Sequence, residues 1–322
     1  MRRLLVIGML LLIPLLLPSC ARGATTPYKL LVWGDCRPWT TSGTAVSAGL
    51  KVISSSMLAQ HADHAIAGGD YVYLGTSDSV ATINAKYDAF FATYSTVGVK
   101  TDYVMGNHEA VGPNGRAVYY SRVHPQPAYY TVSDGPFHVI VLNTNEPGMS
   151  KRIGFYGIGD SRNSVQADWL VRQLRAVTIR RAWIIVALHH PLLDPETDDP
   201  FATTSRAERD ALVRLFHAYG VDLVVQGDTH FYRRHLRADG SNYVTEGMAG
   251  APPVPASTTP IDSHDVKTLG ATGSSPIYGY VTVTRSTTGT ITGRMFWMKS
   301  SDSWTRHLGD RWTLRQVVRT AP

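Results

Sequence analysis

Cysteine is scarce in this chain, and it has no long runs of charge and no internal repeats. Cys20 and Cys36 are the only cysteines among 322 residues, which excludes a disulfide scaffold. Lys and Arg never occur five in a row, and a formal net charge of +6 is small for this length, so we expect no nucleic-acid partner. A hydrophobic fraction of 43% is that of a globular chain with a sizeable core.

Only one segment is strongly hydrophobic, and it lies at the N-terminus. Arg2 and Arg3 precede an apolar stretch, Leu4–Leu17, that a proline interrupts. The stretch is shorter than the roughly 20 residues that cross a bilayer as a helix. A basic start, a short apolar middle and small residues at the end are typical of an export signal. We therefore predict that residues 1–20 export the protein to the periplasm, the medium or the cell envelope.

The end of this segment leaves two possibilities open. Leu17-Pro18-Ser19-Cys20 resembles a bacterial lipobox, in which Cys20 would carry a lipid anchor, and cleavage after Ala21 is the alternative. After a short linker over residues 21–27, we expect a single domain over residues 28–322 with a hairpin region near its C-terminal end. No feature of the sequence indicates the oligomeric state.

From residue 28 onward, short apolar strands alternate with longer amphipathic segments. The expected strands are Tyr28–Trp33, His64–Ala67, Asp102–Met105, Trp183–Leu188 and Val221–Val225. Helices are expected near residues 46–61, 80–96, 164–177 and 205–219. Strands that are separated by helices predict parallel βαβ units, and hence an α/β fold.

Two predicted hairpins interrupt this alternation. One lies over residues 128–143, where Asp134-Gly135-Pro136 joins two apolar runs, and the other lies over residues 278–298. Between Ala251 and Pro276 the chain is rich in Pro, Ser, Thr and Gly, so we expect a long surface loop there.

Polar residues follow five of the strands at their carboxyl ends. They are Asp35, Asp70, Asn107, His189 and the pair Asp228 and His230. Because the carboxyl ends of strands in an open α/β sheet line one crevice, we expect these side chains to lie close together. Carboxylate, amide and imidazole groups that converge are typical ligands of divalent metal ions. The pattern therefore predicts a metal site, and its number of ligands indicates two ions.

The segments that hold these residues carry a family resemblance. They read Trp33-Gly34-Asp35-Cys36-Arg37, Gly69-Asp70-Tyr71-Val72-Tyr73, Gly106-Asn107-His108-Glu109, Val186-Ala187-Leu188-His189 and Gly227-Asp228-Thr229-His230. With them the chain resembles the calcineurin-like metallophosphoesterase superfamily over most of residues 28–236, and within it the purple acid phosphatase branch most. The resemblance implies an α/β fold of two packed mixed β-sheets flanked by helices, a four-layer αββα sandwich with the site at the strand ends.

The resemblance also implies how two ions would be held. Seven residues would be ligands: Asp70 between both ions, Asp35, Tyr73 and His230 on the first, and Asn107, His189 and Asp228 on the second. The nucleophile would be a hydroxide that bridges the ions and not a side chain. Tyr73 would be a ligand only beside Fe(III), because the ordinary pKa of a phenol is near 10; packing against apolar neighbours is the alternative.

Two positions depart from the family pattern. Arg37 stands where a histidine is usual, so this position provides no ligand; its guanidinium would suit phosphate oxygens, with an ordinary salt bridge as the alternative. Asp228 also stands in place of a histidine, and its negative charge favours ions that prefer oxygen ligands. We therefore expect two ions, Fe together with Mn, Fe or Mg, and we expect Zn less at the Asp228 position.

Three further residues are candidates for contact with the substrate or for catalysis. His108 would bind phosphate or protonate the leaving alkoxide, and Glu109 would orient His108; an exposed acid at the start of a helix is the alternative for Glu109. His190 would donate a hydrogen bond to the substrate, or be held by the backbone. Together with Arg37, these residues complete the predicted site.

These features predict an exported, metal-dependent hydrolase of a small phosphorylated substrate, with phosphomonoesters favoured. Phosphodiesters or nucleotides are alternative substrates for the same fold. The altered positions Arg37 and Asp228 keep a second class open, a surface lipoprotein that binds phosphate or nucleotide without turnover. Release of nitrophenol from an aryl phosphate, measured with several metal ions, separates the two classes.

Overall fold

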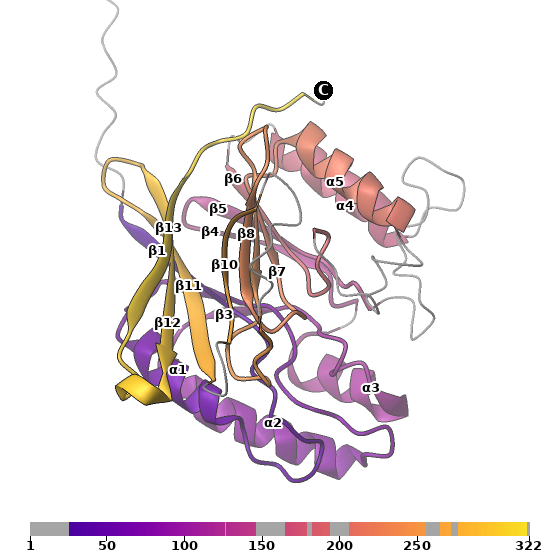
Figure 1. Cartoon of the computed structure of the whole chain (residues 1–322). Coiled ribbons are helices and arrows are strands. Elements are labelled where there is room, and N and C mark those ends of the chain that lie inside the picture. Colours follow the sequence, from indigo (N-terminus) through magenta and orange to yellow (C-terminus); the bar gives the residue numbers. More distant parts are fainter. Residues whose placement is uncertain are drawn as a thin grey trace, which may run out of the picture.

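The computed structural model contains two β-sheets packed against each other, with helices outside them (Figure 1). It describes residues 26–125, 127–145, 165–178, 182–193, 206–255, 265–271 and 276–320. The predicted export signal and Cys20 lie outside these residues. Within the described part, no helix is long and apolar enough to cross a membrane. The two packed sheets with helices outside them confirm the predicted α/β sandwich.

The first sheet combines parallel and antiparallel strands in the order β13-β12-β11-β1-β2-β3. Its strands are β1 (Tyr28–Trp33), β2 (His64–Ala67), β3 (Thr101–Tyr103), β11 (Ile277–Arg285), β12 (Ile291–Lys299) and β13 (His307–Leu314). β1, β2 and β3 run parallel, and β11 pairs antiparallel with β1. The C-terminal hairpin thus extends the sheet that the N-terminal βαβ units begin.

The second sheet has the order β10-β8-β9-β7-β6-β5-β4. Its strands are β4 (Tyr130–Asp134), β5 (Phe137–Val141), β6 (Trp183–Ala187), β7 (Leu223–Gln226), β8 (Tyr232–Leu236), β9 (Asn242–Glu246) and β10 (Asp265–Leu269). The four central strands β5, β6, β7 and β9 are parallel. The predicted hairpin at Gly135-Pro136 joins β4 to β5, where Asp134 pairs with Phe137.

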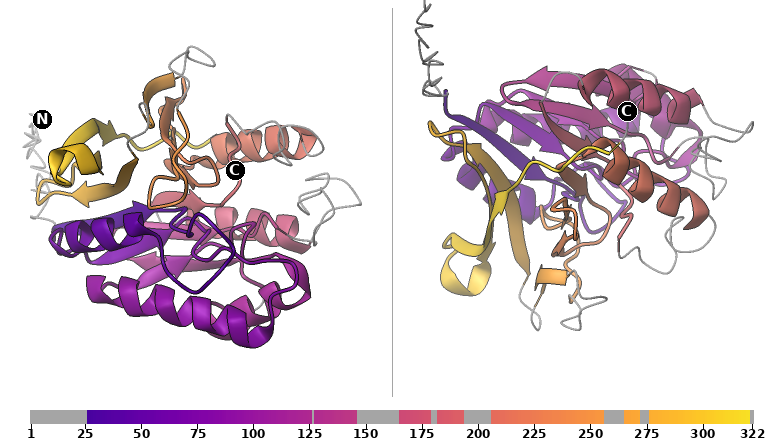
Figure 2. Two further views of the ribbon diagram at one scale, coloured as in Figure 1. Left: turned by 60° about the horizontal axis from the view of Figure 1, so that its bottom comes forward. Right: turned by 90° about the horizontal axis from the view of Figure 1, so that it is seen from above.

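The helices lie beside the sheets on both outer faces (Figures 1 and 2). α1 (Ala48–Leu58), α2 (Val80–Tyr94) and α3 (Gly112–Arg122) lie beside the first sheet, and α4 (Val165–Thr178) and α5 (Arg206–Tyr219) beside the second. Short 3-10 helices follow α2 at Ser95–Val97 and β12 at Ser300–Asp302. α1 and α2 begin at serines whose hydroxyl oxygens accept a backbone N–H, the usual N-cap bond.

Three clusters of buried apolar side chains match the three interfaces between these four layers. Trp33, Phe90 and Tyr94 belong to the cluster under α1 and α2. A second cluster, which includes Val32 and Val225, fills the space between the sheets, and the third lies between the second sheet and α4 and α5. Parallel strands that are covered on both faces are apolar throughout, which is why their sequences form continuous hydrophobic runs.

Several elements differ from the sequence expectation. The predicted surface loop over residues 251–276 contains an edge strand, β10, which pairs antiparallel with β8. α3, β8, β9 and β13 are not expected from the sequence either. α3 reads Gly-Pro-Asn-Gly at its start, and β8 holds two arginines, so neither shows the apolar periodicity of an ordinary helix or strand.

Glu246, at the carboxyl end of β9, is a buried acid within this architecture. Glu246 is only 1% exposed to solvent. Oε1 accepts a hydrogen bond from the Met248 N–H at 3.3 Å, whereas Oε2 has no partner among the described residues. Burial raises the pKa of Glu246 to about 8.

Glu246→Gln is expected to make the stability of the protein less dependent on pH. Between the ordinary glutamate pKa of about 4.3 and pH 8, the folded state keeps a proton that the unfolded chain releases, so the unfolding free energy falls as pH rises. Glutamine has no such proton, so the variant gains about 1.4 kcal/mol per pH unit relative to the natural protein over this range. Urea unfolding of both proteins at pH 5.0 and 7.5 measures this gain. If the unfolding free energies of the variant and the natural protein differ by the same amount at both pH values, the prediction is contradicted.

Candidate metal centre

The predicted metal ligands converge at one edge of the sandwich. Asp35 follows β1, Asp70 follows β2 and His189 follows β6, so the two sheets contribute side chains from the carboxyl ends of their parallel strands. One potential ligand atom from each of these three residues lies within 4.8 Å of the other two. All three residues are buried. The convergence that the sequence predicts is therefore observed between strands of different sheets.

Three aspartates of the site share an unusual backbone conformation. Asp35, Asp70 and Asp228 have φ values of 59°, 59° and 67°, in the left-handed region that side chains other than Gly, Asn and Asp seldom adopt. Each of them directly follows a glycine just beyond a strand. Such a turn costs of order 1 kcal/mol or more, and positions of this kind cluster at functional sites.

Backbone carbonyl groups orient the two histidines that are candidate metal ligands. His189 Nδ1 lies 2.8 Å from the Gly68 carbonyl oxygen, and His230 Nδ1 lies 2.7 Å from that of Pro252. Nδ1 therefore donates its proton outward and Nε2 faces the carboxylates, which is the orientation of a metal-binding imidazole. His189 Nε2 is 3.4 Å from an oxygen of Asp70 and 3.4 Å from one of Asp228, and His230 Nε2 is 3.9 Å from Asp35 Oδ1.

The donor atoms of the site fit a pair of divalent ions. Asn107 Oδ1 and His189 Nε2 are buried and have no hydrogen-bond partner among the described residues. Buried polar atoms are usually paired, and two such atoms beside three carboxylates are in the position of metal ligands. Three carboxylates, one amide and two imidazoles form a donor set that suits Mn, Fe or Mg.

The electrostatics of the site indicate the same requirement for positive charge. Burial raises the pKa of Asp35 well above its ordinary value, because the anion loses its hydration and faces Asp70 and Asp228. Burial opposes ionisation of Asp70 too, but His108, His189 and Arg37 outweigh it and lower the pKa of Asp70. The pKa of His189 is raised despite its burial, since Asp70 and Asp228 stabilise its cation. Nearby basic groups thus stabilise the Asp70 anion, whereas Asp35 keeps an excess of negative charge around it that a metal cation would offset.

Arg37 enters the site beside the carboxylate that would bridge the ions. Its Nε lies 3.4 Å from Asp70 Oδ2, and its guanidinium carbon lies 4.3 Å from the centre of the Tyr73 ring. The same ring meets the His108 imidazole edge-on, with centroids 4.5 Å apart. His108 Nε2 is 3.6 Å from Asp70 Oδ2. The Tyr73 ring therefore contacts both Arg37 and His108 next to Asp70, and its role as a ligand stays a prediction. Burial lowers the pKa of His108, so Arg37 is the permanent cation of this pair.

The burial and the hydrogen-bond partners of Glu109 differ from those that the sequence predicts. It is fully buried, which excludes the alternative of an exposed acid at a helix start. Its carboxylate accepts four backbone hydrogen bonds, from the N–H groups of Asp70, Tyr71, Val72 and Gly106. His108 Nδ1 has no hydrogen-bond partner among the residues described, so this structure gives Glu109 no orienting bond to His108. Glu109 instead ties the loop after β2 to the loop after β3.

His190 and Cys36 are both buried beside the ligands. His190 Nδ1 lies 2.8 Å from the Thr144 hydroxyl, and burial lowers the pKa of His190 to about 4, so its imidazole is neutral at pH 7. Cys36 is a free cysteine, and burial raises the pKa of its thiol. The prediction that Cys36 fills space within the core and is not a nucleophile agrees with both observations.

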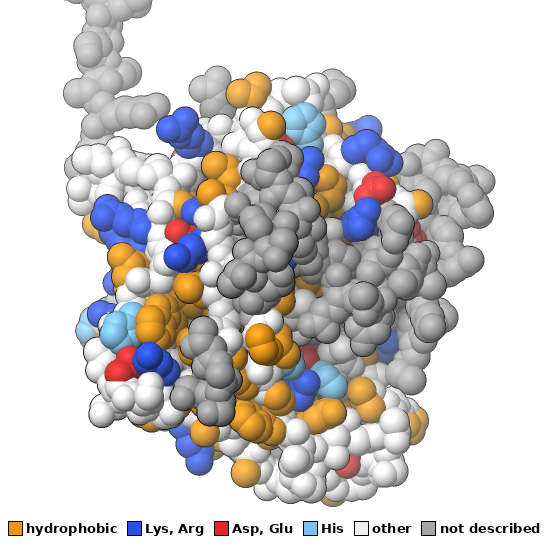
Figure 3. All heavy atoms as spheres, in the orientation of Figure 1, with side chains coloured by type: hydrophobic (Ala, Val, Ile, Leu, Met, Phe, Trp, Pro, Cys, Tyr) orange, Lys and Arg blue, Asp and Glu red, His pale blue; other side chains and the backbone are white. Residues whose placement is uncertain are grey.

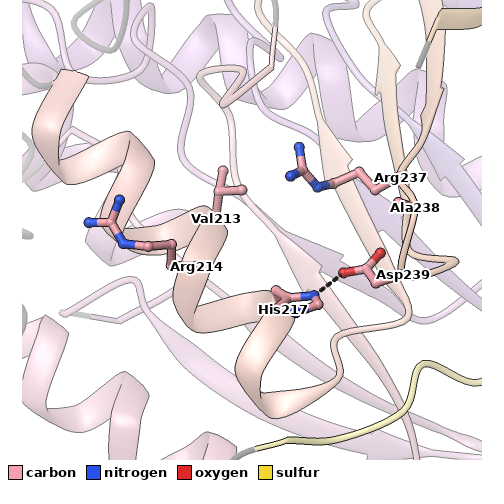
Figure 4. A pocket seen from close by; sticks show the side chains of 6 residues that line it. All are labelled: Val213, Arg214, His217, Arg237, Ala238 and Asp239. Carbon is pink, nitrogen blue, oxygen red and sulfur yellow. Dashed lines mark hydrogen bonds and ion pairs between the residues drawn. The ribbon is translucent and has the colours of Figure 1, made fainter. Parts of the chain in front are cut away.

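A pocket of about 200 Å³ lies away from this centre. It is formed by the C-terminal half of α5 and the turn between β8 and β9, and Figure 4 shows its six lining residues, among them the ion pair of His217 and Asp239. The turn adjoins the amino end of β9, whereas the candidate ligands follow carboxyl ends of the parallel strands. On the face in Figure 3, Lys and Arg side chains are scattered and form no continuous patch over the described residues.

Comparison with known proteins identifies the family. The calcineurin-like phosphoesterase family matches residues 48–232. Human tartrate-resistant acid phosphatase type 5 is 26% identical over 271 residues, which cover 74% of this chain and 78% of that protein. Phosphoenolpyruvate phosphatase from onion (Allium cepa) is 27% identical over 137 residues, 42% of this chain and 25% of the onion protein. The chain therefore spans only a quarter of that relative.

A solved structure extends the comparison to the whole fold. Purple acid phosphatase from yellow lupin superimposes with a TM-score of 0.65 at 17% identity, covering 90% of this chain and 54% of the lupin chain. The fold and site thus define a metallophosphoesterase, as the sequence motifs predict. The chain belongs to the calcineurin-like phosphoesterase family, which places it among the hydrolases that act on phosphoester bonds. The fold of this family implies a dinuclear metal centre.

Proposed function

We propose that this protein is an exported phosphomonoesterase that works with two metal ions. The observation that carries the proposal is the convergence of Asp35, Asp70 and His189, whose potential ligand atoms lie within 4.8 Å of one another. Asp228, His230 and Asn107 complete the donor set from adjoining loops. When two ions are bound there, the chemistry they supply is activation of water and neutralisation of phosphate charge.

The remaining polar residues bind the substrate and move a proton. The Arg37 guanidinium provides a positive group beside Asp70, and the His108 imidazole, whose pKa is lowered by burial, lies beside it; both contact the Tyr73 ring. A guanidinium donates two parallel hydrogen bonds to phosphate oxygens, which holds the ester in place. His108 carries a proton on Nε2, 3.6 Å from Asp70, and delivers it to the leaving oxygen. His190, neutral and fixed by Thr144, donates a hydrogen bond to the substrate.

The Arg37 guanidinium, a positive charge in addition to the metal ions, favours the dianion of a monoester over the single charge of a diester. The test compares p-nitrophenyl phosphate with bis(p-nitrophenyl) phosphate on protein that has been stripped of metal and reloaded with Mn, Fe, Mg or Zn. We expect faster release of nitrophenol from the monoester. Preference for the diester indicates a phosphodiesterase, and binding of phosphate without turnover with any ion indicates the non-enzymatic class.

Export and anchoring belong to the same proposal. Residues 1–20 have the composition of an export signal, and Cys20 is the residue that a lipid would modify. Fractionation of cells that express the natural chain and Cys20→Ala distinguishes the two forms. Release of the variant from the membrane fraction supports the lipid anchor, and identical fractions support cleavage after Ala21.

Asp228→His is expected to shift metal preference towards Zn. The substitution replaces a charged oxygen ligand with an imidazole, which binds Zn better than a hard oxygen donor does. Histidine tolerates the left-handed backbone of this position, where φ is 67°. We expect the ratio of Zn to Mn affinity to rise by about tenfold or more in metal titrations of the stripped protein. Asp228→Asn is the control for loss of charge alone, and an unchanged ratio in the histidine variant contradicts a ligand role for Asp228.

A further inference from the structure

Trp39 is an exposed aromatic residue close in sequence to the metal centre. It follows Arg37 by two residues and is 53% exposed, although large apolar rings are usually buried. The indole Nε1 donates a hydrogen bond to the carbonyl oxygen of Gly250 at 3.2 Å. This bond fixes the direction of a ring that is nonetheless open to solvent.

Residues 250–252, which accept the hydrogen bond of the indole, also form hydrogen bonds with two candidate metal ligands, Asp35 and His230. The Ala251 N–H donates to the backbone carbonyl of Asp35 at 2.7 Å, and the Pro252 carbonyl accepts from His230 Nδ1 at 2.7 Å. Two hydrogen bonds and one peptide unit therefore connect the indole nitrogen to the Asp35 carbonyl. Trp39 stands at the rim of the centre, on the side of Asp35 and His230.

The loop that carries Trp39 is anchored on both sides of the ring. Arg37 Nη1 donates to the Pro38 carbonyl at 3.4 Å, immediately before Trp39. Beyond the ring, Lys86 Nζ donates to the Thr41 carbonyl at 2.8 Å, and the same amine donates to the Tyr73 carbonyl at 2.8 Å. Lys86 is 4% exposed, so these bonds are well shielded from water. A surface that is fixed before binding loses little entropy when a ligand lies on it.

We propose that Trp39 forms a leaving-group subsite that stacks a planar aromatic ring, a nucleobase or an aryl group, of a phosphate monoester. The inference rests on the proposed function for the place of the phosphate, which Arg37 and His108 hold at the metal centre. An aromatic leaving group attached to that phosphate reaches the rim, where the exposed indole face stacks on it. A stacked ring contributes roughly 5- to 150-fold in affinity and tolerates different rings, since every aromatic ring has a π-face.

The first test compares substrates with and without an aromatic leaving group. For Trp39→Ala, kcat/KM is expected to fall 10- to 100-fold with p-nitrophenyl phosphate if the subsite binds aryl rings, and with 5′-AMP if it binds nucleobases. The two substrates therefore distinguish these two kinds of leaving group. With 2-glycerol phosphate, kcat/KM is expected to stay within twofold. Trp39→Phe keeps a ring and retains most of the activity. Equal losses on all three substrates overturn the proposal.

A matched control comes from another exposed hydrophobic side chain. Leu308 on β13 is 54% exposed, and Leu308→Ala removes a similar exposed apolar surface outside the metal centre. We expect this variant to keep the substrate profile of the natural protein. A change in its ratio of aryl to glycerol phosphate activity comparable to that of Trp39→Ala would show that the effect is not specific to the rim.

A second test separates the subsite from turnover. Adenosine and 4-methylphenol contain a ring but no phosphate, so they probe the subsite alone. Saturable quenching of tryptophan fluorescence by either compound, lost in Trp39→Phe and absent with ribose, supports the subsite even if no ester is hydrolysed. Hydrolysis of monoesters without quenching by either compound overturns the subsite and leaves the proposed function standing.

Discussion

Asp70→Asn is expected to lower kcat/KM about a thousandfold or more, which corresponds to about 4 kcal/mol of transition-state stabilisation. Asp70 lies beside three of the groups that would act there: its oxygens lie 3.4 Å from Arg37 Nε, 3.6 Å from His108 Nε2 and 3.4 Å from His189 Nε2. Asp70 is the residue that would be shared by the two ions, so its neutralisation is expected to weaken both ion positions. Elemental analysis is therefore expected to show less than one bound ion per chain in place of two.

The substitution is chosen so that the fold survives it. Asparagine accepts the left-handed backbone of position 70, and its amide oxygen still accepts the His108 N–H that Asp70 Oδ1 accepts at 3.1 Å. Circular dichroism and thermal unfolding report any loss of structure. Asp88 lies on α2 in an exposed ion pair with Arg122 of α3, and Asp88→Asn is the matched control that is expected to keep metal content and activity. Full metal occupancy in Asp70→Asn would refute the site.

The convergence of the ligands could be predicted because its cause is local. An apolar strand that is followed by a polar residue, with or without glycine between them, places that residue at the carboxyl end of the strand, and parallel strands share that edge. Asp35, Asp70 and His189 follow this rule, and their potential ligand atoms meet within 4.8 Å. The same alternation of strands and helices predicts the α/β class, whereas the four-layer arrangement of two packed sheets is implied only by the family resemblance.

Other parts of the site depend on partners that the sequence does not reveal. The carbonyl of Pro252, which orients His230, belongs to the backbone, and every residue type offers that group. Trp39 is conspicuous only once its bond to Gly250, 211 residues away, connects it to the segment that contacts Asp35 and His230. β8 is missed because Arg233 and Arg234 are buried in it, and β9 because it buries Asn242 and Glu246 at its ends. A strand with buried polar or charged residues lacks the apolar alternation that identifies strands.

Glu109 is the residue whose role the structure changes most, and its removal is expected to destabilise the fold. Four N–H groups from two loops converge on its two oxygens, three of them at 2.8 Å and the one of Val72 at 3.2 Å. Glu109→Ala leaves these buried donors without an acceptor, and each unpaired donor costs roughly 1–3 kcal/mol where water does not replace the acceptor. With partial relaxation of the loops, we expect the unfolding free energy to fall by about 3–5 kcal/mol.

Glu109→Gln tests this bonding pattern more narrowly. Glutamine has nearly the same size, but its amide nitrogen cannot accept, so at least one donor from the loops meets another donor. We therefore expect no rescue: urea unfolding places Glu109→Gln much closer to Glu109→Ala than to the natural protein. If Glu109 only oriented His108, the opposite result would be expected: both variants would have normal stability and a lower kcat. Because Glu109 holds the Asp70 and Gly106 N–H groups together, loss of metal is expected to accompany loss of stability, and stable variants that retain both ions would contradict the structural role.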